Sequence, residues 1–212
     1  MFPVSPARRA VSGVTLIEAV VVLAVMSITL ALGVPAMSNW IQASKARNAG
    51  GFYVEGLAMA RQQAMAHNAA SRFLLVRNNG NGQYDWQVDL CFPTQADACD
   101  ANSAGWSAPD AFATADPDQV QGFLSVNRSA AALPKSDVMA ATLAPLGSSS
   151  IYFNATGWVD TRVDERMTSI QFAPAAGFEA TIRPQAIVVG LAGTATQCDP
   201  AVVAPDSRAC PL

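Results

Sequence analysis

The stretch Gly13-Val14-Thr15-Leu16-Ile17-Glu18-Ala19-Val20-Val21-Val22-Leu23-Ala24-Val25-Met26-Ser27-Ile28-Thr29-Leu30 decides the fold of this chain. It joins a short basic leader to a long apolar run that has one carboxylate near its start. No charged residue follows Glu18 until Lys45, so residues 19–44 are free of charge. About twenty apolar helical residues cross the core of a bilayer. The stretch therefore predicts a transmembrane helix over about residues 16–38, and Glu18 is a functional candidate because a carboxylate is costly in lipid.

The leader, residues 1–13, is basic and contains no acidic residue. An ordinary secretory signal is cleaved after its apolar region, at small residues. Here the small residue, Gly13, comes before the apolar run. Cleavage at Gly13 would leave the apolar segment on the mature protein, and Arg8 and Arg9 would hold the leader on the cytoplasmic side.

Length and charge narrow the class of protein. A chain of 212 residues is long enough for one domain with a sizeable core plus an additional element. Its net charge is −3, and it becomes −5 without Arg8 and Arg9. This charge argues against broad electrostatic binding to nucleic acid, although it leaves room for a local basic patch.

We expect the N-terminal helix to span residues 14–70, well beyond the membrane. Gly33 and Pro35 predict a kink, because proline removes a backbone donor and crowds the preceding turn. A helix of about 55 residues is roughly 80 Å long, so its first half must lie in lipid or against other chains. Beyond the kink an amphipathic stripe recurs at spacings of three and four residues: Trp40, Ile41, Ala43, Ala46, Ala49, Phe52, Tyr53, Leu57, Ala60, Ala64 and Met65.

Residues 71–212 are predicted to form an antiparallel β domain. The turn signal at residues 78–82 joins two strands into a hairpin. Residues 91–118 and the tail from Gly193 to Leu212 are loop-like, and residues 129–149 are ambiguous. The segments expected as strands are 72–77, 84–90, 120–126, 151–154 with 157–159 as a hairpin, 169–172, 178–183 and 186–191.

The four cysteines form two near pairs, Cys91 with Cys99 and Cys198 with Cys210. Short loops favour this local pairing among the three that are possible. Two disulfides in an oxidising compartment fit an exported domain, and the alternative is buried free thiols. With one histidine in the chain and no CxxC spacing, no metal site is expected.

The segment from Gly13 to Glu18 resembles the signal of type IV pilins and type II secretion pseudopilins. That signal is a glycine, usually a phenylalanine, then Thr-Leu-Ile-Glu and an apolar run. Val14 departs from the common phenylalanine but keeps its apolar character. Pro35 is the twenty-second residue from Val14, where many pilins also have a proline.

Two later segments resemble the GspH/FimT group of minor pilins and pseudopilins. Residues 57–68 are similar to the end of that group's helix, and Ile151 to Gly157 resembles its Phe-x-x-x-Gly hairpin. The final apolar strand before a cysteine-bearing tail also fits. The resemblance implies an α+β, pilin-like fold, in which a long N-terminal helix packs on a C-terminal antiparallel β-sheet domain.

The resemblance also assigns roles to the head of the helix. Prepilin peptidase would cleave between Gly13 and Val14, and the new Val14 amine would be N-methylated. Glu18 lies one helical turn from Val14 and would pair with the Val14 amine of a neighbouring subunit, an interaction strong enough in low dielectric to select axial register. Pro35 with Gly33 could be a hinge that lets the helix extend when it leaves the bilayer for the filament. The alternatives are an uncleaved anchor, a Glu18 that only reaches the membrane surface, and a Pro35 that is merely tolerated in a transmembrane helix.

The function implied is that of a minor pilin or pseudopilin that primes or caps a type IV pilus or type II secretion pseudopilus. Its partners would be prepilin peptidase, other minor subunits, the inner-membrane assembly platform and membrane lipid. It would be a single-pass inner-membrane protein with a periplasmic domain. The alternative is a pilus-tip DNA receptor of the FimT type, disfavoured because the comparable stretch, residues 193–198, has no Gly-Arg-x-Arg motif.

No catalytic set or cofactor motif is found, because the chain has one histidine and lacks GxSxG, a phosphate loop and HExxH. We interpret His67 as a surface or capping residue. Three tryptophans, Trp86, Trp106 and Trp158, are interpreted as core or loop-packing residues. Three arginines stand among acidic residues and are interpreted as part of a mixed-charge face: Arg162, Arg166 and Arg183.

Overall fold

The computed structural model describes residues 13–118 and 120–211, and the side chains of Pro35 and Ala36 lie outside this description. The predicted leader therefore lies outside the described residues, apart from Gly13. The chain divides into two units, Met1–Trp40 and Ile41–Leu212.

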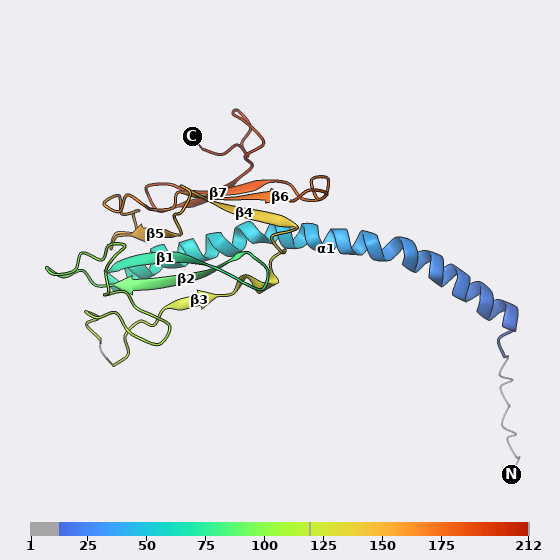
Figure 1. The fold of residues 1–212 in the computed structure, drawn as a ribbon, viewed down its shortest axis with the longest axis horizontal. Coiled ribbons are helices and arrows are strands. Elements are labelled where there is room, and N and C mark those ends of the chain that lie inside the picture. Colours follow the sequence, from blue (N-terminus) through green and yellow to red (C-terminus); the bar gives the residue numbers. More distant parts are fainter. Residues whose placement is uncertain (1–12, 119, 212) are drawn as a thin grey trace, which may run out of the picture. The chain divides into compact units, whose positions relative to one another are not determined.

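One helix, α1 (Leu16–His67), belongs to both units (Figure 1). It is somewhat shorter than the predicted span of residues 14–70. Its assignment is continuous through Gly33 and Pro35. After its last turn, Asn68 adopts a positive φ of 49°, a conformation that asparagine tolerates and that ends helices.

The predicted stripe on the second half of α1 is confirmed over most of its length. Six of its residues are buried at spacings of three and four: Ala46, Ala49, Tyr53, Leu57, Ala60 and Ala64. Trp40, Ile41 and Met65 are exposed instead. Four of the six buried residues are alanines, and these small side chains let the strands approach the helix backbone. Gly56 adds to this, because a Cβ there would come within 2.6 Å of the Phe73 ring and 2.8 Å of the Trp86 ring.

The first sheet has the strand order β3-β2-β1-β5 and is antiparallel throughout. The predicted hairpin is confirmed, with Ala70 opposite Cys91 and Arg77 opposite Tyr84. The strands are β1 (Ala70–Arg77), β2 (Tyr84–Cys91), β3 (Val126–Arg128) and β5 (Ser150–Phe153).

The second sheet has the order β4-β6-β7-β8, also antiparallel. Within the Ile41–Leu212 unit α1 contacts both sheets: the Tyr53 ring stacks on Phe172 at 5.4 Å, and Tyr53 Oη donates to the carbonyl of Tyr84 at 2.8 Å. All buried side chains of the described residues fall between Ala46 and Cys198, so this unit carries its own core. The strands are β4 (Met139–Ala144), β6 (Ser169–Pro174), β7 (Gln185–Val189) and β8 (Ala195–Cys198).

Four segments differ from the sequence prediction. The segment 120–126 is a strand only from Val126, because the Asp118 carboxylate accepts from the N–H groups of Val120 and Gln121 and holds a turn. Residues 178–183 form turns closed on the Phe178 carbonyl. Residues 157–159 contribute only an isolated bridge, Phe153 to Val159. The tail contains β8, whose polar and half-exposed residues resemble a loop in sequence.

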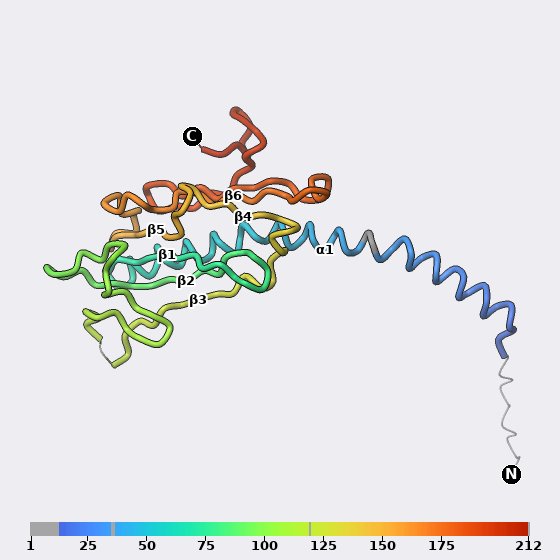
Figure 2. Tube along the Cα trace, viewed as in Figure 1, coloured from blue at the N-terminus to red at the C-terminus, as the bar shows by residue number. Residues whose placement is uncertain are grey.

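The long connection between β2 and β3 lies at the end of this unit where α1 ends (Figure 2). The His67 ring contacts the Phe123 ring there, with the two centroids 5.4 Å apart. The structure joins Cys91 to Cys99 in this connection and Cys198 to Cys210 in the tail. This is the local pairing that the spacing favours.

Candidate functional site

The head of α1 is capped by residues of the quoted stretch itself. Thr15 precedes the first helical residue, and its Oγ1 accepts a hydrogen bond from the N–H of Glu18 at 3.3 Å. Thr-x-x-Glu is the sequence of a capping box, and it accounts for a helix that starts at Leu16 and not at the predicted residue 14. Glu18 in the first turn also complements the positive end of the helix dipole. Because Thr15 lies after Gly13, the cap belongs to any chain that begins at Val14.

Gly13 and Val14 are non-helical and exposed. A backbone outside regular structure is accessible to a peptidase, and a Cβ added to Gly13 would meet nothing within 4 Å. The structure thus places Gly13, Val14 and Glu18 within one short segment, as their spacing requires. Pro35 lies 17 residues further along the same helix than Glu18, and its side chain is outside the description, so its hinge role stays a prediction.

The described surface of the first half of α1 is mostly apolar. Every described side chain from Gly13 to Trp40 is exposed. Two hydroxyls within the run bond to the helix itself: Ser27 Oγ donates to the Leu23 carbonyl at 2.7 Å, and Thr29 Oγ1 donates to the Val25 carbonyl at 3.0 Å. Such back-bonding is what a hydroxyl in lipid requires. Among the described helices, α1 is long and apolar enough to cross a membrane.

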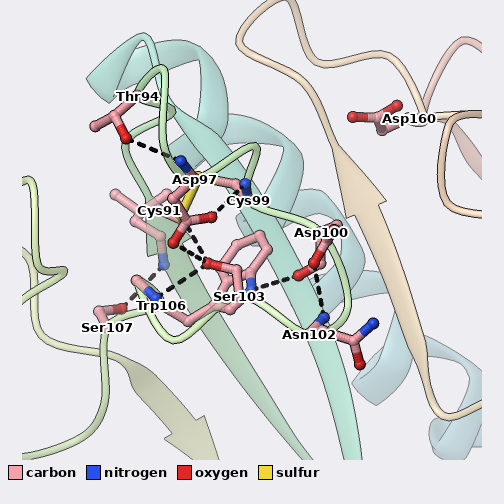
Figure 3. The surroundings of a disulfide bond; sticks show 12 residues. Cys91, Thr94, Asp97, Cys99, Asp100, Asn102, Ser103, Trp106, Ser107 and Asp160 are labelled. Carbon is pink, nitrogen blue, oxygen red and sulfur yellow. Dashed lines mark hydrogen bonds between the residues drawn. A yellow bond between two sulfur atoms is a disulfide. The ribbon is translucent and has the colours of Figure 1, made fainter.

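The first disulfide lies in a network of hydrogen bonds that fixes its loop (Figure 3). The Asp97 carboxylate accepts from Ser103 Oγ at 2.5 Å and from the N–H of Cys99 at 2.8 Å. These bonds, that of Ser103 first, lower the pKa of Asp97. The Sγ atoms of Cys91 and Cys99 and a carboxylate oxygen of Asp97, atoms of the kind that bind metal ions, lie within 4.8 Å of one another. Because both sulfurs are joined in the disulfide, neither is available as a thiolate ligand. The disulfide and the hydrogen bonds of Asp97 hold the loop in place.

A buried ion pair in the first sheet, between Arg72 and Asp89, contacts the same loop. Asp89 is fully buried and accepts from Arg72 Nε at 2.9 Å and Nη2 at 2.7 Å. Gln87 Nε2 donates to its other oxygen at 2.6 Å. The Arg72 guanidinium also lies 4.7 Å from the centroid of Trp106. The alternation of apolar and polar residues in β2 predicts that the Asp89 side chain faces solvent. It is buried because a loop from residues 91–118 covers that face of the sheet.

Arg61 joins α1 to two loops of the β unit. Its Nε donates to the carbonyl of Gly157 at 3.1 Å. Gly157 and Gly193 have φ values of 78° and 77°. A Cβ on Gly157 would lie 2.8 Å from Met65 Sδ, and one on Gly193 would overlap the Gly157 carbonyl oxygen. The Phe-x-x-x-Gly segment, Phe153 to Gly157, therefore has a structural role in seating the helix.

The remaining candidates are spread over the chain and are not gathered in one site. His67 is exposed at the end of α1, as interpreted. Trp86 and Trp106 are buried, whereas Trp158 is 55% exposed and is therefore not a core residue.

The three arginines do not form one patch. Arg162 binds the Asp160 carboxylate through Nη2 at 2.6 Å, whereas Arg166 donates to the Val163 carbonyl and Arg183 lines a separate cavity. Residues 193–198 form a turn and β8.

Comparison with protein-family models, curated proteins and solved structures finds no match for this chain.

Proposed function

We propose that this chain is a minor pilin or pseudopilin subunit that primes or caps a type IV pilus or type II secretion pseudopilus. The observation that carries the proposal is the first half of α1. Every described side chain of this half is exposed, and the single carboxylate of Glu18 in its first turn is its only charged group among the described residues. Such a surface needs lipid before assembly and packs against other helices afterwards. A domain with its own core follows it.

Processing at Gly13–Val14 is compatible with the local geometry. The bond lies in exposed, non-helical backbone, and its cleavage leaves the Thr15 cap in place. The new Val14 amine would stand one turn before Glu18. In an assembled filament Glu18 of one subunit would pair with the amine of its neighbour, because both charges are otherwise unpaired in an apolar surrounding. Prepilin peptidase, other minor subunits and the inner-membrane platform are the partners, with the β unit in the periplasm.

The capping-box sequence offers the Glu18 side chain a competing, purely structural role, and one substitution separates the two roles. Glu18→Gln keeps a side chain that functions at this position of a capping box but removes the charge. Glu18→Val removes both, and Ser27→Val is a control within the same run. Each full-length variant would be co-expressed with prepilin peptidase and the other minor subunits, and its incorporation into sheared filaments measured by immunoblot.

We expect both Glu18 variants to remain in the membrane fraction and to lose incorporation, and Ser27→Val to assemble normally. Normal assembly of Glu18→Gln with loss in Glu18→Val would reduce Glu18 to a capping residue. Normal assembly of both would remove any role of Glu18 in filament formation.

A further inference from the structure

The cations of the Ile41–Leu212 unit fall into two sets. Six arginines have an acceptor: four bind carboxylates, Arg72, Arg128, Arg162 and Arg208, and two bind backbone carbonyls, Arg61 and Arg166. In the described part of the chain the other five cations have no ion pair, side-chain hydrogen bond or ring contact: Lys45, Arg47, Arg77, Lys135 and Arg183.

All five unpaired cations lie at one end of the unit, around the segment of α1 that follows Ile41. Lys45 and Lys135 line a cavity of about 480 Å³ on one side of the helix, together with the turn at residues 78–81. Arg47 and Arg183 line a cavity of about 730 Å³ on another side. Arg77 lines a third cavity beside Lys135. We name this end the basic root and define it by these five residues.

The opposite end of the unit is acidic. No lysine or arginine occurs between Arg77 and Arg128, whereas seven aspartates do. Five of those aspartates are in the connection between β2 and β3, which lies where α1 ends. At the basic root, among the described residues, two carboxylates line the same cavities, those of Asp137 and Asp199. The unit is therefore electrically polar, with its unpaired positive charge at the start of its helix.

We propose that the basic root binds the anionic headgroups of the membrane that α1 crosses. Lys45 follows Trp40 by five residues in one helix, a rise of about 8 Å. Connectivity therefore keeps the root within reach of the headgroups, whichever way the unit is turned. Juxtamembrane lysines and arginines are attracted to anionic lipid. The distal aspartates oppose this little, because charges separated by more than a Debye length are screened.

This inference rests on the membrane-anchored part of the proposed function, not on filament assembly. Residues 41–212 lack both Gly13–Val14 and Glu18 but hold the complete described core and both disulfides. Their binding to lipid therefore stands or fails independently of the pilin assignment.

Residues 41–212 would be sedimented with vesicles of phosphatidylcholine, with and without phosphatidylglycerol, at low and high salt. We expect binding only to the anionic vesicles, weakening as salt rises. Each cation removed should lower the partition coefficient about fivefold, so that the double variant Lys45→Gln with Lys135→Gln loses about 25-fold. The matched control is Arg162→Gln with Arg166→Gln, which makes the same change in net charge away from the root and should stay within about twofold of the wild type.

A second readout uses the full chain. Lys45 and Lys135 are its only lysines, so an amine-acylating reagent modifies these two side chains and the N-terminal amine, and peptide mass spectrometry reads the two lysines separately. In vesicles containing phosphatidylglycerol we expect both lysines to react more slowly than in phosphatidylcholine. Equal reactivity in the two lipids, no preference for anionic vesicles, or equal losses in the two double variants would overturn the proposal. Binding to duplex DNA without binding to vesicles would also overturn it and would assign the root to nucleic acid.

Discussion

The two halves of α1 have the same backbone but opposite surroundings. From Leu16 to Trp40 every described side chain is exposed and nearly all are apolar. From Ile41 to His67 a narrow stripe is buried, and the other faces mix polar residues with apolar ones such as Met65. The boundary between the two units therefore lies inside a continuous helix, between Trp40 and Ile41. One helix both carries a segment that is long and apolar enough to cross a membrane and contributes a buried stripe to the core of the folded unit.

The largest effect is expected when the same substitution is made in each half. Leu57→Asp buries an unpaired carboxylate in the core, where Leu57 is 0% exposed. This substitution should lower the free energy of unfolding by more than about 5 kcal/mol, enough to unfold the β unit. Leu23→Asp should leave the melting of the β unit unchanged but lower membrane insertion, because a central aspartate costs about 2.5–3.5 kcal/mol there.

Near-ultraviolet circular dichroism of the buried tryptophans measures the first effect, and membrane fractionation of the full chain measures the second. Loss of tertiary structure in Leu23→Asp, or retention of it in Leu57→Asp, would contradict the assignment of the two halves.

A smaller effect is expected where the β loops meet the second half of α1. Gly193→Ala combines a positive φ with overlap on the Gly157 carbonyl oxygen, and should cost roughly 2–4 kcal/mol. Gly177→Ala is the matched control, because its φ is 89° but a Cβ there meets nothing within 4 Å. It should cost about 1 kcal/mol. Urea unfolding of residues 41–212 measures both, and equal losses would show that only backbone strain matters.

The smallest effect concerns Tyr53, whose hydroxyl bonds the Tyr84 carbonyl. Tyr53→Phe should cost about 0.5–1.5 kcal/mol at neutral pH. Burial raises the pKa of Tyr53 above its ordinary value of 10. The folded state therefore retains the proton that the unfolded state loses, and this contribution to stability is complete below pH 10 and declines above it by up to about 1.4 kcal/mol per pH unit.

The difference in unfolding free energy between the wild type and Tyr53→Phe should therefore shrink as pH rises past 10. Denaturant titrations at several pH values measure this difference. A difference that stays constant would show that Tyr53 ionises as freely when folded as when unfolded.

Sequence periodicity predicted what depends on local pattern: α1, its buried stripe, and the hairpin of β1 and β2. It failed where a side chain takes backbone hydrogen bonds that a strand would otherwise use. The Asp118 carboxylate does this and holds a turn before Val126. It also missed features that depend on distant contacts. The burial of Asp89 follows from the loop that crosses its face, and the basic root joins Lys45 to Lys135 and Arg183 only through the fold.

The most direct test of the central claim is the mass and N-terminal sequence of the chain from cells that contain prepilin peptidase. If the chain is processed as a pilin or pseudopilin subunit, the protein begins at Val14, carries a methyl group on that amine, and stays in the membrane fraction. A chain that retains residues 1–13, or one cut after the apolar run and released from the membrane, would contradict it.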